Sequence, residues 1–324
     1  IQALLQAIQH KVSVITGGPG TGKTTALQAL IAVLVQHGYS VALASPTGRA
    51  ARRLAESTGQ PAQTLHRLLG YQPPNDFKHN AEQPLACDIL VIDEASMLDL
   101  LLMNHVLKAL PAESHLVLVG DVDQLPSVGA GDVLRNIIDS DKVAVTRLQQ
   151  IYRQAEQSYI VENAHRVNAG QLPEFSQAAE DFYVFDIEGT EAVGDWVVDV
   201  VQNRIPRKFG VHPLRDIQVL VPMYRGEAGV HTLNERLQKA LNPASSRSAE
   251  RKINGTVFRV GDKVMQVRNN YEKDVFNGDV GLVTGLDGET QTLTVNFDGT
   301  AVKYDWVEAD ELTHAFAISV HKSQ

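Results

Sequence analysis

The run Gly17–Thr24, Gly-Gly-Pro-Gly-Thr-Gly-Lys-Thr, has the residue types and spacing of a phosphate-binding loop. Glycines let backbone N–H groups curl around phosphate oxygens, and a helix that follows the loop adds the positive end of its dipole. In this pattern the ammonium of Lys23 reaches the β- and γ-phosphates, and the hydroxyl of Thr24 joins the shell of a Mg²⁺ ion. The alternative is a glycine-rich turn before an ordinary helix. The residues predicted to contact ATP are Gly18, Pro19, Gly20, Thr21, Gly22, Lys23, Thr24 and Thr25.

A pair of acids, Asp93 and Glu94, follows the apolar run Ile89–Ile92. Two carboxylates at the end of a buried strand are costly unless they meet a metal ion or water. The pair therefore predicts that Asp93 holds Mg²⁺ and that Glu94 orients and deprotonates an attacking water. The alternative is a solvated pair that opens the next helix, where the helix dipole favours acids.

Two further polar residues are candidates for contacts to the γ-phosphate. The run Leu116–Val119 ends in Gly120–Pro126, and Gln124 in that segment is a candidate sensor of the γ-phosphate or the attacking water. Arg153 follows the first α/β unit and is a candidate arginine finger. The alternatives are an Asp-rich turn for the first and a solvated surface arginine for the second.

The elements that position these residues alternate between apolar runs and helical spacing. Four runs are predicted to be buried strands: Val12–Ile15, Val41–Ala44, Ile89–Ile92 and Leu116–Val119. Leu27, Leu30, Ile31 and Leu34 have helical spacing within 24–36. Continuous apolar strands separated by helices predict a parallel sheet covered on both faces. The proline-rich segment Tyr71–Leu85 is predicted to leave this sheet as a small hairpin.

The second half of the chain starts another α/β unit and then changes character. Ile217–Val221 predicts a strand and Val230–Leu241 a helix. Short strand-like runs then follow across 253–305, separated by Asn-Gly or Asp-Gly pairs such as Asn277–Gly278, which are strong hairpin signals. This region is predicted to be a small all-β barrel, and Phe316–Val320 a return to buried strand.

Composition bounds the class of protein. The 324 residues are 44% hydrophobic and 21% charged, which suits a globular protein of two or three domains. Cys87 is the only cysteine, so intrachain disulfides and cysteine zinc sites are excluded. The absence of a membrane-length apolar run or a signal-peptide pattern leads us to expect a cytoplasmic protein without a membrane partner.

The net charge of −9 argues at first against nucleic acid as a partner. However, residues 171–200 contain eight acids and no Lys or Arg, and without them the balance is −1. A local group of Arg49, Arg52, Arg53 and Arg67 against Glu56 carries +3. Charge therefore permits a nucleic-acid path without requiring one.

Taken in order, these motifs resemble those of RecD-like superfamily 1 DNA helicases over nearly the whole chain. Gly17–Thr24 resembles motif I, 45–54 motif Ia, 64–70 motif Ib, and 93–97 motif II. Similarly, 120–128 resembles motif III, 152–154 motif IV, and 320–324 the start of motif V. The resemblance implies that Lys23, Glu94, Gln124 and Arg153 are catalytic.

The resemblance also implies an architecture: an α/β P-loop NTPase with two RecA-like motor domains. The first domain would span 1–153, with a strand-separating pin at 71–86. The second would span 154–250 and 312–324, interrupted by a Src-homology-3-like barrel at 251–311. In this family the adenine-recognising glutamine would precede Ile1, although Gln2 is close, and motif VI would follow Gln324. The second motor domain is therefore expected to be incomplete.

The implied partners are single-stranded DNA, junctions of single- and double-stranded DNA, and other subunits of a recombination or repair complex. Movement would be 5′-to-3′, with ATP and Mg²⁺. The expected DNA contacts are Pro46, Thr47, Gly48, Arg49, Thr64, His66, Arg67, Ser127, His321, Lys322 and Ser323. For His66, an interior structural histidine is the alternative.

Two other functions stay open. One is a P-loop ATPase of another class, such as a nucleotide or small-molecule kinase, which would leave the barrel without a role. The other is an ATPase subunit with a DNA-binding or assembly role and no unwinding of its own. Stimulation of hydrolysis by single-stranded DNA, by a small acceptor, or by neither would separate the three.

Overall fold

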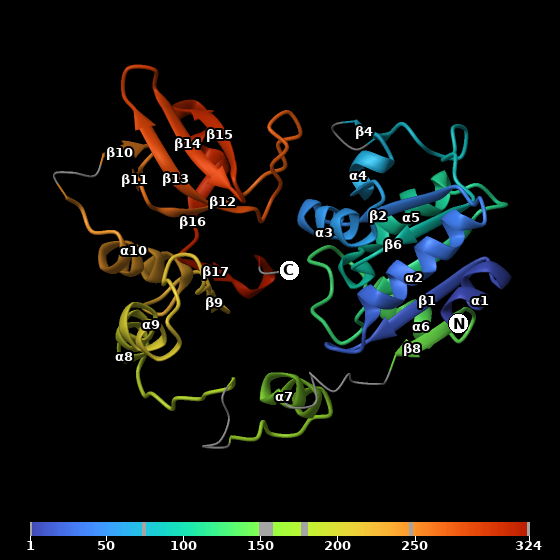
Figure 1. Ribbon diagram of the computed structural model, residues 1–324, viewed down its shortest axis with the longest axis horizontal. Helices are drawn as coiled ribbons and strands as arrows, with labels where there is room; N and C mark the ends of the chain where they lie inside the picture. Colours follow the sequence, from blue (N-terminus) through green and yellow to red (C-terminus); the bar gives the residue numbers. More distant parts are fainter. Residues whose placement is uncertain (1, 73–75, 149–157, 176–180, 246–248, 323–324) are drawn as a thin grey trace. The chain divides into compact units, whose positions relative to one another are not determined.

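The computed structural model describes residues 2–72, 76–148, 158–175, 181–245 and 249–322. The chain falls into two compact units, residues 1–184 and 185–324 (Figure 1). The boundary between these units lies after the predicted domain boundary at residue 153. The limits of the two motor domains stay a prediction. Within the described parts of the chain, no helix is both long and apolar enough to cross a bilayer.

The first unit is built on a six-stranded sheet whose strands are all parallel. Its strand order is β3-β2-β6-β7-β1-β8. The strands are β1 (Val12–Gly17), β2 (Val41–Ser45), β3 (Ala62–Thr64), β6 (Ile89–Ile92), β7 (His115–Gly120) and β8 (Ala144–Leu148). The predicted parallel sheet is confirmed, and each of the four predicted strands lies within it.

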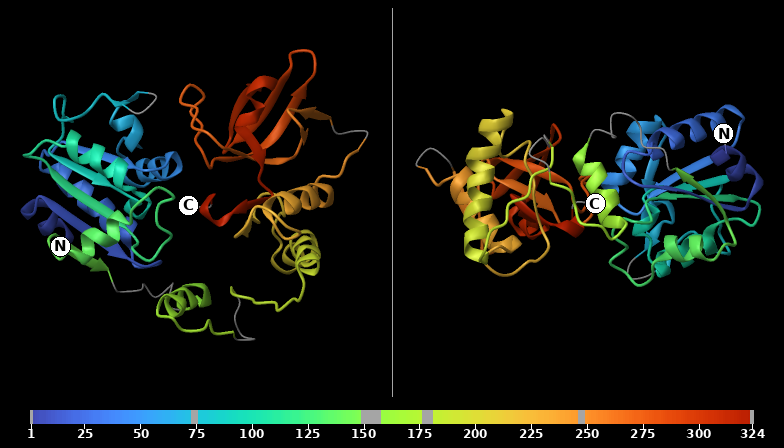
Figure 2. Two further views of the ribbon diagram at one scale, coloured as in Figure 1. Left: turned by 180° about the vertical axis from the view of Figure 1, so that it is seen from behind. Right: turned by 90° about the horizontal axis from the view of Figure 1, so that it is seen from below.

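Helices cover both faces of this sheet, as the continuous apolar strands predict (Figure 2). The helical segments are α1 (Gln2–Gln9), α2 (Lys23–Gln36), α3 (Gly48–Thr58), α4 (Leu65–Leu68), η1 (Ala95–Met97), α5 (Leu100–Ala109), α6 (Val133–Asp139) and α7 (Tyr159–Asn168). Alternate residues of one strand serve the two faces: Leu90 and Ile92 pack with α5 and α6, whereas Ile89 and Val91 pack with α1, α2 and α3.

Two strands of the sheet, β3 and β8, were not predicted. β3 has only three residues, Ala-Gln-Thr, and β8 reads Ala-Val-Thr-Arg-Leu with one fully buried residue, Thr146. Both are edge strands of the sheet. An edge strand is covered less completely than a central one, so it does not need the continuous apolar run that identified the other four.

The predicted hairpin after α4 is short. β4 (Tyr71–Gln72) pairs antiparallel with β5 (Asp76–Phe77). The backbone beyond β5 folds back onto the unit: Lys78 N donates to Gly70 O at 3.0 Å, and Leu85 N donates to Ala109 O at 2.8 Å. Phe77 and Leu85 are buried, so part of the predicted 71–86 insertion packs into the core of the unit, whereas Tyr71 and residues 81–84 are exposed.

The second unit begins with a helical segment and a small parallel sheet. The helical turns are α8 (Thr190–Asp199), the π-helical η2 (Val200–Arg204), α9 (Ile205–Phe209) and α10 (Val230–Leu241). β9 (Val219–Val221) pairs parallel with β17 (Ala317–Ser319), nearly a hundred residues later. Asn234 of α10 binds the backbone of β17: its side-chain amide donates to Ala317 O at 2.7 Å and accepts from Ala317 N at 3.0 Å.

The chain between these two strands forms the predicted all-β module. The five-stranded antiparallel sheet has the order β15-β14-β13-β12-β16, and the hairpin β10-β11 lies beside it (Figure 1). The strands are β10 (Glu250–Ile253), β11 (Thr256–Arg259), β12 (Lys263–Gln266), β13 (Val280–Asp287), β14 (Thr292–Phe297), β15 (Thr300–Asp305) and β16 (Leu312–His314). Its core includes Phe258, Leu293 and Tyr304, each at most 1% exposed.

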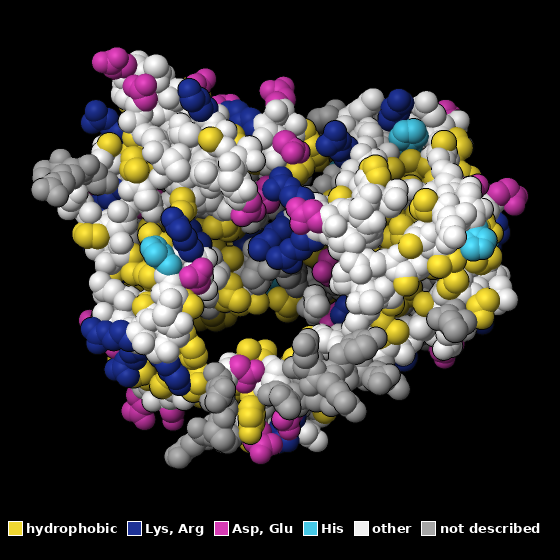
Figure 3. All heavy atoms as spheres, in the orientation of Figure 1, with side chains coloured by type: hydrophobic (Ala, Val, Ile, Leu, Met, Phe, Trp, Pro, Cys, Tyr) yellow, Lys and Arg dark blue, Asp and Glu magenta, His cyan; other side chains and the backbone are white. Residues whose placement is uncertain are grey.

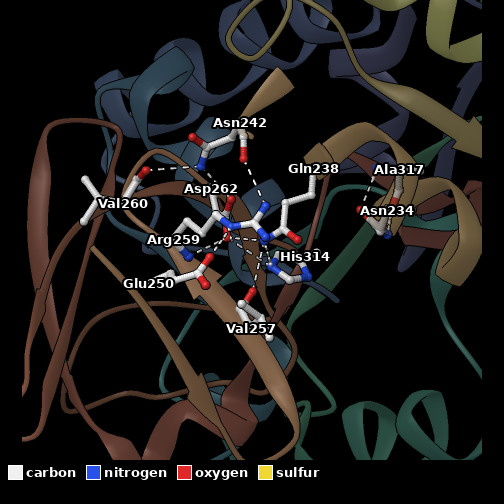
Figure 4. A network of polar contacts seen from close by, with 10 residues as sticks. All are labelled: Asn234, Gln238, Asn242, Glu250, Val257, Arg259, Val260, Asp262, His314 and Ala317. Carbon is white, nitrogen blue, oxygen red and sulfur yellow. Dashed lines mark hydrogen bonds and ion pairs between the residues drawn. The ribbon is translucent and has the colours of Figure 1, made fainter. Parts of the chain in front are cut away.

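A buried carboxylate fixes this barrel to α10 (Figure 4). Asp262, which is 0% exposed, accepts hydrogen bonds from Gln238 Nε2 at 2.7 Å, Asn242 Nδ2 at 2.8 Å and Arg259 N at 2.7 Å. His314 Nε2 lies 3.2 Å from the same carboxylate. A buried charge is tolerated only when it is hydrogen-bonded, and here the donors come from the helix, the barrel and the segment between them. The barrel is therefore held on this unit by a specific polar network.

Candidate nucleotide and nucleic-acid sites

The parallel sheet of the first unit brings the predicted chemical residues to one edge. In register, Thr16 of β1 lies beside Gly120 of β7, and Ala44 of β2 lies beside Ile92 of β6. The phosphate loop, the acid pair and the segment 121–127 start where these strands end. In open α/β sheets, ligands bind at this carboxyl edge.

The phosphate loop is shaped by glycines and followed by a helix, as predicted. Gly22 has φ 82°, a left-handed conformation that glycine adopts without strain, and it is the N-cap of α2. Lys23 Nζ donates to Gly17 O at 2.6 Å and to Gly18 O at 3.0 Å. Thr21 Oγ1 donates to Gly18 O at 2.8 Å. The lysine thus bonds to the carbonyls of the loop, within reach of any anion that the loop binds.

The acid pair after β6 lies in a partly buried and electrostatically unfavourable place. Burial raises the pKa of Asp93, and the ammonium of Lys23 and a backbone hydrogen bond from Glu94 oppose that shift. Burial also raises the pKa of Glu94, and the neighbouring Asp93 raises it further. Glu94 has φ 53°, a strained left-handed conformation for a residue with a side chain, of the kind that is common at functional sites.

Asp121 is a residue of this edge to which the sequence analysis gave no role. It is 2% exposed, and its Oδ2 lies 3.7 Å from Lys23 Nζ. Gln124 Nε2 donates to the same oxygen at 3.3 Å. The structure therefore joins Gln124 to Lys23 through Asp121. The signal in the sequence was an acid directly after a buried strand, the same signal that identified Asp93.

A magnesium ion fits the residues present at this edge. Thr24 is exposed in the first turn of α2, and Asp93 is a half-buried carboxyl whose pKa is raised by burial. Among the described residues, no group of three or more His, Cys, Asp or Glu could hold a metal ion. Mg²⁺ typically takes one or two protein ligands together with substrate phosphates, so a site of this composition suits it.

The predicted DNA contacts of the first unit follow β2, β3 and β7. Thr47 Oγ1 accepts from Ala50 N at 3.3 Å and caps α3. Thr64 is 3% exposed, and its Oγ1 accepts from Arg67 N at 3.2 Å to cap α4. Both threonines therefore have a structural role as N-caps. Pro46 and Arg49 are half-buried, Gly48 is buried, and Arg67 is exposed.

His66 lies in an aromatic cluster at the base of the hairpin. Its ring centroid is 5.5 Å from that of Tyr71 and 5.9 Å from that of Phe77, and Phe77 lies 4.4 Å from His105. Burial lowers the pKa of His66, with Asp99 opposing the shift and His105 adding to it. A lowered pKa favours the neutral imidazole at neutral pH, so the cluster favours the interior-histidine alternative over a cationic phosphate contact.

The other predicted site residues are dispersed. Ser127 Oγ donates to Gly129 O at 2.9 Å. In the second unit, His321 is exposed, and Lys322 Nζ donates to Asn277 Oδ1 at 2.7 Å. Arg153 and Ser323 lie outside the described residues. Figure 3 shows Lys and Arg side chains interspersed with Asp and Glu over the face drawn there. Charge alone therefore does not mark a nucleic-acid track.

Family models match two parts of the chain. A model described as an AAA domain matches residues 1–130, and one described as the ATP-dependent RecD-like DNA helicase SH3 domain matches residues 233–297. The first covers the phosphate loop, the acid pair and Gln124, and the second covers α10 and most of the barrel.

Curated relatives are similar over nearly the whole chain. It is 38% identical over 321 residues to the ATP-dependent RecD2 DNA helicase of Deinococcus radiodurans, which covers 98% of this chain and 42% of the relative. It is 30% identical over 353 residues to the RecBCD enzyme subunit RecD of Mycolicibacterium smegmatis, covering 98% of this chain and 62% of that subunit. The chain thus spans about half the length of the curated relatives it matches.

Solved structures share the fold. A Bacteroides Pif1 bound to single-stranded DNA matches with a TM-score of 0.52 and 19% identity, covering 100% of this chain and 82% of that one. The Pif1 helicase of Candida albicans matches with a TM-score of 0.51 and 22% identity, covering 99% and 84%. Together with the barrel, these matches confirm the predicted two-domain RecA-like fold.

Proposed function

We propose, because this chain belongs to the RecD-like helicases of superfamily 1, that it is the ATP-driven motor of a DNA helicase. The observation that supports this most directly is the single sheet edge that carries a phosphate loop, a half-buried acid pair and Gln124 linked to Lys23 through Asp121. This set of groups matches what phosphoryl transfer to water needs: a cradle for phosphates, a base and a group that positions the nucleophile.

In the proposed reaction the chain's own groups bind the phosphates and move one proton. Lys23 exchanges the carbonyl oxygens of Gly17 and Gly18 for phosphate oxygens of ATP. Glu94 accepts a proton from the attacking water, whose oxygen bonds to the γ-phosphorus as the bond to the ADP oxygen breaks. The raised pKa of Glu94 makes its carboxylate a stronger base than an ordinary glutamate. Gln124 orients the water, and Arg153 stabilises charge on the transferred group.

The hydroxyl of Thr24 and the carboxylate of Asp93 are the residues proposed to hold Mg²⁺, with phosphate oxygens as further ligands. When bound, the ion would supply positive charge beside the phosphate oxygens, where negative charge develops. The raised pKa of Asp93 supports this assignment, because a nearby cation would compensate the charge that burial disfavours.

The proposed substrate is single-stranded DNA next to a duplex, with movement from 5′ to 3′. The relatives' names support a DNA helicase, and the name RecBCD subunit supports partners in a recombination or repair complex. The residues proposed to contact the strand are Pro46, Thr47, Gly48, Arg49, Thr64, Arg67, Ser127, His321, Lys322 and Ser323; for His66 the interior role is favoured. An unwinding assay on partial duplexes with a 5′ or a 3′ overhang tests the direction, and unwinding only from the 3′ overhang would reverse it.

The alternative, an ATPase subunit that binds DNA without unwinding it, is tested in the same assay. We expect both DNA-stimulated hydrolysis and strand separation from the full-length protein. Hydrolysis with no separation of any partial duplex would favour the alternative. Hydrolysis that responds to a small phosphate acceptor but not to DNA would favour a kinase.

The variant Glu94→Gln tests the assignment of the base. It keeps the shape of the side chain and removes its basicity, so we expect ATP binding to be retained and kcat to fall by about 10²–10⁴-fold. Glu56→Gln, an exposed residue of α3, is the matched control and should leave kcat unchanged. A Glu94→Gln protein that hydrolyses ATP at the parent rate would remove Glu94 as the base.

A further inference from the structure

The imidazole of His165, on α7, lies against the phosphate loop. A Cβ atom added to Gly18 would be 2.9 Å from Cε1 of His165 and 3.7 Å from each of the two ring nitrogens. These are the three nearest atoms outside the neighbouring residues, so the first contact that a side chain at Gly18 would meet is the ring of His165. The φ of Gly18 is not positive, which means that contact with His165, rather than backbone conformation, is what a side chain here would violate.

The helix that carries His165 is held by buried and capping contacts. Ser158 Oγ accepts from Val161 N at 3.4 Å and caps α7, and it donates to Asp181 at 2.6 Å. Asn163 is 2% exposed and exchanges two hydrogen bonds with the backbone of Glu174, at 3.0 and 2.6 Å. Because both bonds use the side-chain amide of Asn163, they orient α7 against the segment that follows it. His165 thus lies on a helix whose orientation relative to Glu174 and Asp181 is set by these hydrogen bonds.

One ring nitrogen of His165 has no partner. Nε2 is buried and makes no hydrogen bond within the described part of the chain. Buried polar atoms in proteins are nearly always hydrogen-bonded, and an exception next to a binding loop points to a ligand as the missing partner. The carbonyl oxygen of Gly18 already accepts hydrogen bonds from Lys23 and Thr21. Nε2 of His165 takes no part in these hydrogen bonds within the loop.

We propose that His165 is a nucleotide-contacting residue whose Nε2–H donates a hydrogen bond to the phosphate chain of the bound nucleoside triphosphate. This inference rests on the proposed function, because it assumes that 17–24 binds such a nucleotide. Through this contact α7, which lies far from the loop in sequence, helps to bind the phosphates. Nucleotide binding then also stabilises the position of α7 against the phosphate loop.

Nucleotide affinity in the full-length protein tests the contact. His165→Phe keeps a ring over Gly18 and removes the donor, so we expect binding of a non-hydrolysable ATP analogue to weaken by about tenfold, as for a lost hydrogen bond to a charged group. His165→Gln places an amide nitrogen near the position of Nε2 and should recover most of the affinity. Val167→Ala, on the exposed side of the same helix, is the control and should bind as the parent does. Parent-like binding by His165→Phe would overturn the proposal.

Lys23→Ala separates failure of this inference from failure of the site. If Lys23→Ala weakens binding and His165→Phe does not, the loop binds nucleotide and only the role of His165 is wrong. If neither variant changes the affinity, the nucleotide site itself is wrong.

A second pair of variants tests the packing independently of the hydrogen bond. Gly18→Ala should weaken nucleotide binding, because its methyl group collides with the ring of His165. His165→Ala removes the collision together with the proposed hydrogen bond, so Gly18→Ala should cost little further affinity in the His165→Ala background. If Gly18→Ala weakens binding equally in both backgrounds, His165 does not lie on Gly18 in the working protein, and the proposal falls.

Discussion

At the scale of single residues, the acids proposed to carry out catalysis lower the stability of the folded protein. Asp93 and Glu94 are placed where burial raises the pKa of each carboxyl, and the charge of Asp93 raises the pKa of Glu94 further. The left-handed backbone of Glu94 adds strain at the same position. Such costs are typical where a fold keeps groups ready for chemistry rather than for its own stability.

This arrangement predicts that neutral replacements of the pair stabilise the protein. The folded-state pKa values lie above the ordinary ones, so ionisation costs stability; the cost is absent below about pH 4 and complete above the raised values. Asp93→Asn should therefore raise the melting temperature at pH 8, and the gain should shrink as the pH falls toward 4. Differential scanning calorimetry across this range measures it, with Glu56→Gln as the control. A lower melting temperature for Asp93→Asn at pH 8 would contradict the prediction.

How far the sequence predicted the site depended on whether a residue's role is local. Lys23 and Asp93 were found because a strand, a loop and a helix that are contiguous in sequence define their surroundings. Asp121 was missed because an aspartate in a turn has an ordinary structural explanation. His165 was missed because nothing near it in sequence connects its helix to the phosphate loop. For His66 the sequence left both the DNA contact and the interior role open, because its partners Tyr71 and Phe77 form a cluster only after the hairpin folds.

At the scale of elements, the strand ends that carry motifs also begin helices. Thr47 and Thr64 each follow a strand and cap the helix after it. Each of these threonines is an N-cap in the structure and is also proposed to contact DNA. Sequence alone cannot separate these roles, because a threonine before a helix has the N-cap pattern whether or not it meets a ligand. Edge strands were missed for a comparable reason: their residues need not be apolar.

The hairpin β4–β5 predicts a separation of two activities. Phe77 is 7% exposed and packs on His105, so a replacement of the whole segment 71–86 would also damage the core. Substituting only 72–76 by Gly and Ser, with Tyr71 and Phe77 kept, should abolish unwinding and leave DNA-stimulated ATPase largely intact. Strand-separation and steady-state ATPase assays on one preparation measure both activities.

A variant of the anchor provides the comparison for this prediction. Phe77→Ala keeps the tip and should lower the free energy of unfolding by about 3–5 kcal/mol, as a deleted core aromatic does. Chemical denaturation measures this loss. If replacing 72–76 lowered ATPase and unwinding together, or lowered stability as Phe77→Ala does, the tip would be structural rather than a wedge.

At the scale of the whole molecule, the net charge of −9 and a proposed polyanionic partner stand in opposition. Charges separated by more than the Debye length, about 8 Å at physiological ionic strength, are largely screened. Contacts to phosphates are therefore set by the arginines and lysines near them rather than by the net charge of the chain. A net negative chain and a salt-sensitive, nearly sequence-independent affinity for DNA are compatible on this reasoning.

The salt dependence of binding to single-stranded DNA therefore tests the proposed track. The logarithm of the binding constant should fall linearly with the logarithm of salt concentration, with a slope of about −0.7 for each phosphate neutralised. Arg67, exposed in α4, is proposed to neutralise one phosphate, so Arg67→Ala should make the slope less negative by about 0.7 on every sequence tested. Arg207→Ala removes another exposed arginine, on α9, which is not among the proposed contacts, and should change neither the slope nor the affinity at physiological salt. Fluorescence anisotropy titrations with unstructured oligonucleotides, from 50 to about 300 mM salt, cover the range in which counterion release dominates. Equal effects of the two substitutions would show that Arg67 contributes only to the overall charge, and the strand would then follow a path other than the ends of β2 and β3.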